Sequence, residues 1–326
     1  MKNILVVGGA GYIGSHMVWL LGQRGVHVVT LDNLSAGHRD AVLHGELVVG
    51  DMADRAVLDR VLSSRRFDAV MHFASYIQVG ESVTDPAKYY LNNVAHTLAL
   101  LAAMRDHGVQ RFVFSSTAAV FGEPRYSPLD ERHPREPINP YGRTKWMIEQ
   151  ALDDYDRAYG LRSVSLRYFN AAGAHPEALL GERHEPETHL VPLVLQAASG
   201  RRPHVTVFGR DYDTPDGTCI RDYIHVMDLA EAHWQALRYL ADGGATRAFN
   251  LGNGDGYSVQ QVVDTARAVT GRPIAVLEGA RRAGDPARLV ADAALARAVL
   301  QWQPRHGDLR TIVQDAWRWE SRAAGA

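Results

Sequence analysis

The sequence is poor in cysteine and lacks long apolar runs. Its 326 residues include a single cysteine, Cys219, so the chain cannot form an internal disulfide, and a reducing cytoplasm is the expected location. No apolar run approaches the roughly 18 residues that a membrane helix requires. The apolar stretch at residues 4–7 runs into glycines and is too short for a signal peptide. We therefore expect neither a secreted nor a membrane protein.

Net charge and lysine are also scarce. The 35 basic and 37 acidic side chains leave a formal charge of -2, which argues against a nucleic-acid partner, because such partners usually require a strongly basic face. Only three basic residues are lysines: Lys2, Lys88 and Lys145. A compositional bias is the simplest explanation of this shortage. A lysine in such a background is nevertheless a candidate for chemistry that arginine cannot perform.

Short apolar runs alternate with helical patterns in the first half of the chain. The runs are rich in Val, Ile and Phe and are continuous, which is typical of strands buried on both faces. They span residues 3–8, 26–32, 47–50, 69–73, 110–116 and 163–168. Helical patterns lie between them at 12–24, 55–65, 85–107 and 141–159. This alternation predicts an α/β fold with a doubly wound, Rossmann-type parallel sheet.

The pattern becomes irregular after residue 170. Shorter elements are separated there by stretches that carry Gly and Pro, at 174–186, 209–217 and 279–286. We expect residues 1–170 to form an NAD-binding domain. Residues 171–326 are expected to form a smaller α/β portion, mainly for substrate binding, with some segments returning to the first domain. Five prolines between 124 and 140 predict a stiff loop that leads into a helix opening at Tyr141.

A glycine-rich turn follows the first apolar run. Gly8, Gly11 and Gly14 have the spacing G-x-x-G-x-x-G. They allow a tight turn, close approach of a pyrophosphate and close packing of helix on strand, and the helix N-terminus offers N–H groups to the phosphates. The pattern alone also occurs in ordinary loops, but between a strand and a helix it predicts dinucleotide binding. Asp32 ends the second run and can accept hydrogen bonds from a ribose, which favours NAD over NADP.

A tyrosine and a lysine stand four residues apart after the fifth apolar run. Tyr141 and Lys145 project from the same face of the predicted helix, and Thr117 follows the fifth run. We expect the ammonium group to lower the pKa of the tyrosine toward neutrality. The tyrosine could then take a proton from an alcohol or sugar hydroxyl while a nicotinamide takes hydride. The alternative is a chance pair on an exposed helix.

Several longer motifs accompany these residues almost from end to end. They are GGAGYIGSH (8–16), LDNLS (31–35), GD (50–51), HFAS (72–75), VGESV (79–83), NN (92–93), FSST (114–117), PYGRTK (140–145), RYFNAAGAHP (167–176) and RDYIHVMDLA (221–230). With these motifs the chain resembles the extended short-chain dehydrogenases/reductases and, within them, the family of UDP-glucose 4-epimerases. The last two motifs are the most telling, because generic reductases lack them.

The resemblance implies a role for individual residues. Tyr141 resembles the general acid/base, Lys145 its electrostatic partner and Thr117 the assisting hydroxyl. The implied cofactor contacts are Gly8, Gly11, Tyr12, Ile13, Gly14, Asp32, Asn33, Leu34, Ser35, Asp51, Met52, Phe73, Ala74, Ser75, Asn92, Tyr141, Lys145 and Phe169. The implied substrate contacts are Thr117, Asn170, His189, Leu190, Phe208, Arg221, Arg282, Asp285 and Leu289. Two arginines suit a diphosphate, and a carboxylate suits a ribose diol.

The implied reaction inverts C4 of a UDP-hexose and interconverts UDP-glucose and UDP-galactose through a 4-keto intermediate. NAD is then tightly bound and regenerated in each turnover, and no metal is expected. Three positions depart from the family pattern. Ile77 replaces a lysine that often helps to hold the cofactor, and Thr188-His189-Leu190 replaces Asn-Asn-Leu. Leu289 replaces the tyrosine of glucose-restricted bacterial members, which widens the sugar pocket toward UDP-GlcNAc and UDP-GalNAc.

Other functions of the same fold stay open. A nucleotide-sugar 4,6-dehydratase typically carries an acidic pair directly after the active-site threonine, whereas this chain has Ala118 and Ala119. A decarboxylase, a net oxidoreductase with dissociable NAD(P) and a non-catalytic NAD-binding regulator are further alternatives. The expected partners are a UDP-hexose substrate and a second copy of the chain. A homodimer would form through the apolar faces of the helices at 85–107 and 141–159.

Overall fold

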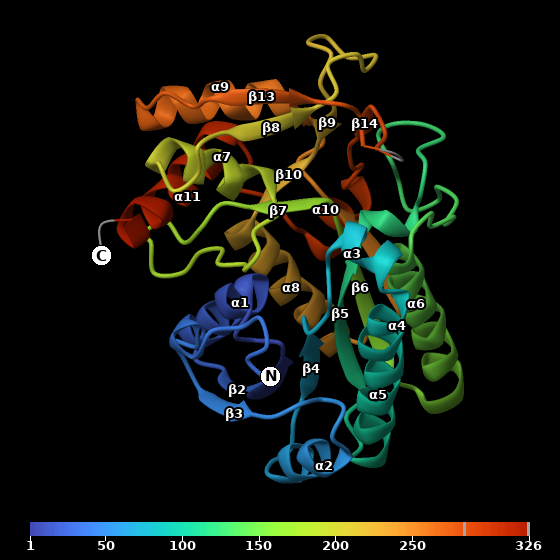
Figure 1. Cartoon of the computed structure of the whole chain (residues 1–326). Coiled ribbons are helices and arrows are strands. Elements are labelled where there is room, and N and C mark those ends of the chain that lie inside the picture. The colour runs from blue at the N-terminus through green and yellow to red at the C-terminus, as the bar shows by residue number, and fades with distance from the viewer. Residues whose placement is uncertain (283–284, 325–326) are drawn as a thin grey trace.

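The computed structural model describes residues 1–282 and 285–324 and contains a seven-stranded parallel sheet (Figure 1). The strand order is β11-β6-β5-β4-β1-β2-β3. The strands are β1 (Asn3–Val7), β2 (His27–Asp32), β3 (Glu46–Val49), β4 (Ala69–His72), β5 (Arg111–Thr117), β6 (Arg162–Tyr168) and β11 (Arg247–Leu251). This arrangement confirms the predicted Rossmann-type fold, and the first six strands match the predicted ranges to within one residue at each end.

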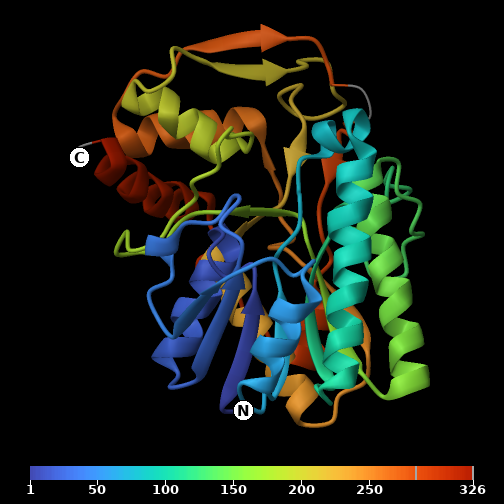
Figure 2. The same ribbon diagram turned by 60° about the horizontal axis from the view of Figure 1, so that its bottom comes forward.

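Helices cover both faces of this sheet. The alternation of side chains along β1 shows why: Ile4 and Val6 join one apolar core, and Leu5 and Val7 join the other. The first face is covered by α1 (Tyr12–Gln23), α8 (Val226–Ala241) and α10 (Ala294–Leu300). The second face is covered by α2 (Arg55–Ser63), α5 (Thr97–Asp106) and α6 (Pro140–Tyr159), of which α5 and α6 lie side by side in Figure 2. Burial on both faces explains the continuous apolar runs.

The helix predicted at residues 85–107 is not a single α-helix. It consists of α4 (Pro86–Tyr89), a π-helical segment η2 (Tyr90–His96) and α5, and the short helix α3 (Val79–Thr84) precedes it. The predicted helical stretch is therefore helical from Pro86 to Asp106, but the sequence did not indicate the π-helical segment in its middle. A π-helical segment adds a residue per turn and changes which side chains face the neighbouring element, and such segments are frequent at functional sites.

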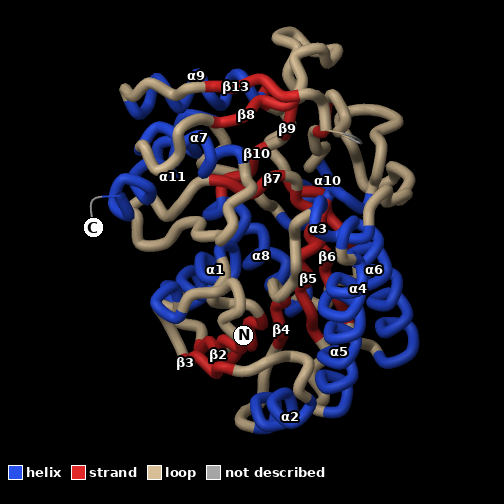
Figure 3. Tube along the Cα trace, viewed as in Figure 1, coloured by secondary structure: helices blue, strands red, loops and turns tan. Residues whose placement is uncertain are grey.

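The smaller portion has its own core above the carboxyl ends of the parallel strands. In it α7 (Leu190–Ser199), α9 (Val259–Thr270) and α11 (Leu309–Ala324) pack together. Figure 3 shows its short strands, which form the pairs β7 (Asn170–Ala172) with β10 (Tyr223–His225) and β8 (Val205–Phe208) with β13 (Val276–Gly279), and the trio β12 (Tyr257–Ser258), β9 (Ile220–Arg221) and β14 (Arg288–Leu289). These strands have two to four residues, in agreement with the shorter elements expected here, whereas the helices α8 and α11 have 16 residues each.

Two segments from the second half of the chain belong to the large sheet and its helical cover. Strand β11 pairs with β6 at its edge, and α8 packs against α1 and the sheet. Trp302 is fully buried in the same core as Ile4. Within the described part of the chain, none of the helices combines the length and hydropathy required of a membrane-spanning segment.

Candidate active site

The turn between β1 and α1 is built from glycines, two of which leave no room for a side chain. Gly8 has a φ of +81°, and a Cβ at this position would overlap the backbone nitrogen of Ala74. A Cβ at Gly14 would overlap the carbonyl oxygen of Gly8. Gly11 is the N-cap of α1, so no side chain caps this helix. A Cβ at Gly11 would meet only the Gly8 carbonyl oxygen, at 3.6 Å. This side of the turn is open, so the first N–H groups of α1 can receive a phosphate.

We expect Gly14→Ala to lower the free energy of unfolding by about 1–3 kcal/mol and to reduce the amount of bound NAD, because the added methyl group must push the turn away from the helix. Thermal unfolding and the nucleotide content of the purified protein measure the two effects. Gly80→Ala in α3 is a matched control, since a Cβ there meets nothing within 4 Å. Equal stability and NAD content in the two variants would contradict this account of the turn.

Asp32 holds the loop that follows β2. Its Oδ2 accepts a hydrogen bond from the Ala10 N–H at 2.9 Å, and its Oδ1 accepts one from the Leu34 N–H at 2.8 Å. The neighbouring Asn33 donates from Nδ2 to Asp51 Oδ2 at 2.8 Å. The carboxylate predicted to bind a ribose therefore also ties the glycine-rich turn to the loop after β2.

The predicted cofactor residues follow successive strands of one sheet. Each group begins at the end of a strand or directly after it. After β1 come Gly8, Gly11, Tyr12, Ile13 and Gly14, and β2 ends at Asp32, the first residue of the group Asp32–Ser35. After β3 come Asp51 and Met52, after β4 come Phe73–Ser75, and after β6 comes Phe169. Because the carboxyl ends of parallel strands meet at one edge, these residues line the same edge of the sheet. Asn92 reaches this edge from η2, where its Nδ2 lies 3.5 Å from the Ala74 carbonyl oxygen. The open glycine turn and this row of side chains fit NAD, and the individual contacts stay predictions.

The predicted catalytic trio is brought together by β5 and α6. Thr117 is the last residue of β5. The Asn139 side chain caps α6 by accepting from the Gly142 N–H at 2.8 Å, and Pro140 opens the helix as expected. This start places Tyr141 in the first turn of α6 and Lys145 one turn later, and both side chains are buried. The Thr117 hydroxyl lies close enough to the Tyr141 phenol to lower the pKa of the phenol.

Lys145 is held in one position by two acceptors and an aromatic ring. Its Nζ donates to Ser75 Oγ at 2.7 Å and to the carbonyl oxygen of Ser115 at 2.8 Å. It also lies 4.8 Å from the centre of the Phe114 ring. Burial lowers the pKa of Lys145 to about 7, although the carboxylate of Glu149 opposes this shift. The charged form of this lysine is therefore less favoured than that of an exposed lysine.

The pKa of Tyr141 moves in the direction opposite to the one expected from the sequence. Burial raises this pKa to about 12, and the Thr117 hydroxyl only partly offsets the effect. The expectation failed because it counted the charge of Lys145 and ignored desolvation, which disfavours a buried phenolate. In addition, the Lys145 ammonium is directed at Ser75 and Ser115 and has a lowered pKa of its own.

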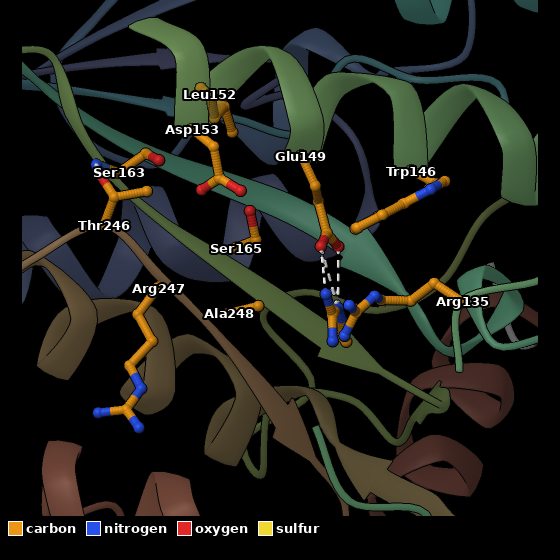
Figure 4. Close-up of a pocket in the computed structure, with 11 residues that line it drawn as sticks. Arg135, Trp146, Glu149, Leu152, Asp153, Ser163, Ser165, Thr246, Arg247 and Ala248 are labelled. Atoms are coloured by element: carbon orange, nitrogen blue, oxygen red, sulfur yellow. Dashed lines mark hydrogen bonds and ion pairs between the residues drawn. The ribbon is translucent and has the colours of Figure 1, made fainter. Parts of the chain in front are cut away.

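A buried ion pair joins α6 to β6 close to Lys145. Glu149 projects from α6 toward the guanidinium group of Arg167 on β6, and both side chains are almost fully buried. Figure 4 shows Glu149 at the centre of this interaction, in a hollow also lined by Trp146 and Arg247. The Oε1 of Glu149 additionally accepts from Ser116 Oγ at 2.5 Å. The carboxylate thus joins α6 to β5 and β6, one helical turn after Lys145.

The sequence reasoning missed Glu149 and Asn93 as positioning residues. Asn93 Oδ1 accepts from the Tyr76 N–H at 2.9 Å, and its Nδ2 donates to the Tyr76 carbonyl oxygen at 3.0 Å and to Thr144 Oγ1 at 3.3 Å. It therefore joins the loop after β4 to α6. The Asn92-Asn93 pair was a visible signal, but only Asn92 was assigned. Glu149 gave a weaker signal, since an acidic residue on a helix is usually solvated.

Four of the predicted substrate residues, Phe208, Arg221, Arg282 and Asp285, lie on or between the short strands of the smaller portion. Arg221 Nη2 lies 2.9 Å from Asp285 Oδ1, and the Arg282 guanidinium lies 4.0 Å from the centre of the Phe208 ring. Leu289 pairs with Arg221 between β14 and β9. These arginines, this carboxylate and this ring form one group of polar and aromatic side chains.

Three further predicted substrate residues lie on other elements or in a loop. Asn170 opens β7, and Leu190 opens α7. Leu289 packs beside Phe169 against a buried cluster that includes Ala118, directly after Thr117. The predicted sugar pocket is therefore connected to the end of β5. His189 is different, because its Nδ1 lies against the carboxylates of Glu182 and Glu187. Its contact with a sugar stays a prediction.

Comparisons with known proteins agree with this geometry. Residues 4–252 match the model of the NAD dependent epimerase/dehydratase family. A UDP-glucose 4-epimerase from Rhizobium meliloti is 55% identical over 321 residues, which cover 98% of each chain.

Solved structures are similar over the whole fold. The UDP-glucose 4-epimerase from Brucella ovis in complex with NAD has a TM-score of 0.96 and 50% identity, and the match covers 98% of this chain and 99% of that one. The UDP-Glc/GlcNAc 4-epimerase from Campylobacter jejuni has a TM-score of 0.87 and 41% identity, with coverage of 99% and 100%.

Proposed function

We propose, since the chain belongs to the NAD dependent epimerase/dehydratase family, that it catalyses 4-epimerisation of UDP-hexoses and interconverts UDP-glucose and UDP-galactose. The observation that carries the proposal is the buried group formed by Thr117, Tyr141 and Lys145 at the carboxyl end of the sheet. The similarity to UDP-glucose 4-epimerases over nearly the full chain supports the choice of substrate. The open glycine turn and the strand-end residues hold NAD tightly.

The chemistry of the trio follows from its burial. NAD, when bound, supplies a reversible acceptor for the hydride of the sugar C4. Tyr141 removes the proton of the 4-hydroxyl and later returns it, while the Thr117 hydroxyl helps to hold the same oxygen. Burial raises the pKa of Tyr141 to about 12, so the phenolate is disfavoured at neutral pH. Added positive charge must therefore stabilise the phenolate, and the protonated form of Lys145 provides part of it.

The residues after Thr117 support epimerisation over dehydration. Ala118 and Ala119 form the start of a 3-10 turn, η3 (Ala118–Val120), and Ala118 is buried. Neither side chain can donate or accept a proton. The ketone formed at C4 therefore has no acid beside it from these two positions to drive elimination of water, so it is returned to an alcohol.

The decisive experiment uses purified protein and UDP-galactose without added NAD. We expect UDP-glucose to accumulate until both sugars reach equilibrium, because the bound cofactor is regenerated. Chromatography of the nucleotide sugars measures the conversion, and the nucleotide released by denaturation measures bound NAD. A folded, NAD-loaded protein that leaves UDP-galactose unchanged would overturn the proposal. A requirement for stoichiometric added NAD would instead indicate a net oxidoreductase.

Substrate breadth is expected to depend on Leu289. We propose that the pocket also accepts UDP-GlcNAc and UDP-GalNAc, because leucine leaves more space than the tyrosine of glucose-restricted enzymes. Leu289→Tyr should lower kcat/KM for UDP-GlcNAc relative to UDP-glucose by about 10–200-fold, the range for shape discrimination in an apolar pocket.

The control for this variant is Leu277→Tyr, an exposed leucine on β13. Steady-state kinetics with both substrates compare the two variants with the wild type. A wild type that does not use UDP-GlcNAc, or a Leu289→Tyr variant that still accepts it equally well, would place the control of substrate size at another residue.

A homodimer through α5 and α6 is part of the proposal. Large apolar side chains are exposed on this side of the molecule, including Leu91 on η2 and Met147 on α6, which are 58% and 45% exposed. Their elements lie side by side (Figure 2). Sedimentation velocity at micromolar concentration measures the assembly directly. We also propose a cytoplasmic location, which the single buried thiol of Cys219 supports.

A further inference from the structure

Four potential metal ligands converge in the loop between β7 and α7. They are Glu182, His184, Glu187 and His189, and one nitrogen or oxygen atom of each lies within 4.8 Å of those of the others. The side chains of Glu182 and Glu187 are only 6% and 4% exposed. Two carboxylates that are this deeply buried require positive charge nearby. The proton and hydride transfers proposed above make no use of this cluster.

The distances between the four side chains match a shared ion. His184 Nδ1 lies 3.0 Å from Glu182 Oε1 and 3.8 Å from Glu187 Oε2. His189 Nδ1 lies 2.6 Å from Glu182 Oε1 and 3.4 Å from Glu187 Oε1. Ligands about 2.0–2.1 Å from a tetrahedral Zn²⁺ are separated by roughly 3.3 Å. The observed separations are spread around this value.

A second observation points to a ligand at the centre of the cluster. The Nδ1 atom of His189 is buried but has no hydrogen-bond partner, even though a carboxylate oxygen lies 2.6 Å away. The two atoms are thus close without the alignment of an N–H donor and its acceptor. This nitrogen faces both carboxylates, at 2.6 Å from Glu182 and 3.4 Å from Glu187, and is the atom of His189 that could bind an ion.

We propose that Glu182, His184, Glu187 and His189 form a four-coordinate site for a divalent transition-metal ion, with Zn²⁺ as the best match. Two imidazoles and two carboxylates favour Zn²⁺ over Mg²⁺ or Ca²⁺, which prefer oxygen ligands. The protein supplies all four ligands, so the site is closed in the way that structural zinc sites are. The sequence reasoning expected no metal, because these residues were considered singly and His189 was assigned to the sugar.

The position of the cluster defines what the ion would stabilise. His189 is the N-cap of α7, and the Glu182 carbonyl oxygen accepts from Trp319 Nε1 of α11 at 3.2 Å. On the other side, the Tyr12 ring packs edge-on against His184, with ring centres 6.3 Å apart. Tyr12 begins α1 directly after the glycine turn. The ion would thus connect the smaller portion to the NAD-binding turn.

The first test measures metal in the purified full-length protein. We expect about one zinc per chain by elemental mass spectrometry after gel filtration, and its loss in His184→Ala. The matched control is His107→Ala, which removes an imidazole 2.8 Å from a single carboxylate, Asp59. Zinc at 100 times its Kd should raise the Tm of the metal-free wild type by about 5 °C and leave that of His184→Ala unchanged.

The second test does not depend on the folding of a variant. Co²⁺ added to metal-free wild type should produce the intense visible absorption of a four-coordinate site, and Zn²⁺ should displace it, whereas Mg²⁺ should not. A wild type that binds no stoichiometric zinc and gives no such spectrum would overturn the proposal and leave an ion-pair cluster. Equal zinc content in His184→Ala and His107→Ala would overturn it as well. Neither readout requires catalytic activity, so failure here is distinct from failure of the proposed reaction.

Discussion

Tyr141→Phe is expected to lower turnover by about 10²–10⁴-fold, the range for loss of a general acid/base. The hydroxyl group is the only atom group removed, and the buried ring still packs at the start of α6. The fold and the bound NAD should therefore be retained. Conversion of UDP-galactose, measured together with the NAD content and Tm of the variant, tests the prediction.

The control is Tyr155→Phe, which removes a hydroxyl group from a tyrosine farther along the same helix. The Tyr155 ring packs against the Tyr159 ring and against the apolar core that includes Leu152. We expect it to keep near-normal turnover. If Tyr141→Phe also kept near-normal turnover with NAD bound, another group would have to move the proton.

Lys145→Arg is expected to lower kcat by about 10²-fold or more, although it keeps a positive charge. The Lys145 side chain is 2% exposed and donates to Ser75 and Ser115. A planar guanidinium is larger and cannot occupy the same position, and a displacement of about 1 Å near reacting groups can cost about 10²-fold in rate. Overpacking should also lower the free energy of unfolding by about 1–3 kcal/mol.

Two further variants separate size from charge. Lys88→Arg makes the same substitution in a surface ion pair, where Nζ lies 2.6 Å from Glu81 Oε1, and should leave the kinetics unchanged. Lys145→Met keeps a long side chain without the charge, and it should lose turnover with little loss of stability. Normal kinetics in Lys145→Arg would show that Lys145 has no specific role.

The central strands were predictable because each obeys a local rule. Residues 4–7 alternate between two apolar cores, so this run is apolar throughout and ends at a glycine turn. Strand β11 was missed because Arg247–Leu251 contains an arginine and an asparagine, and its place in the sheet is set by pairing with β6, about 80 residues earlier. The π-helical segment was missed because its composition is that of an ordinary helix.

The sequence predicted those parts of the candidate site in which the spacing of residues along one element determines their positions. The glycines of the turn and the pair Tyr141 and Lys145 lie at fixed intervals on one element, so their proximity follows from helix and turn geometry. The pKa of Tyr141 could not be predicted in this way, because burial depends on the packing of β5, α6 and the smaller portion. The environment of His189 was missed for a related reason, since it depends on how a loop folds back on itself.

The shared core of Ile4 and Trp302 has a consequence for synthesis of the chain. Strand β1 leaves the ribosome almost at once, whereas α8, β11 and Trp302, which cover one face of its sheet, follow much later. At 5–20 residues per second, roughly 300 residues take about 15–60 s. For that time the apolar side chains on this face, Ile4 and Val6 among them, have no complete cover. The nascent chain should therefore rely on chaperones until its last quarter is made, even though the finished protein hides this face completely.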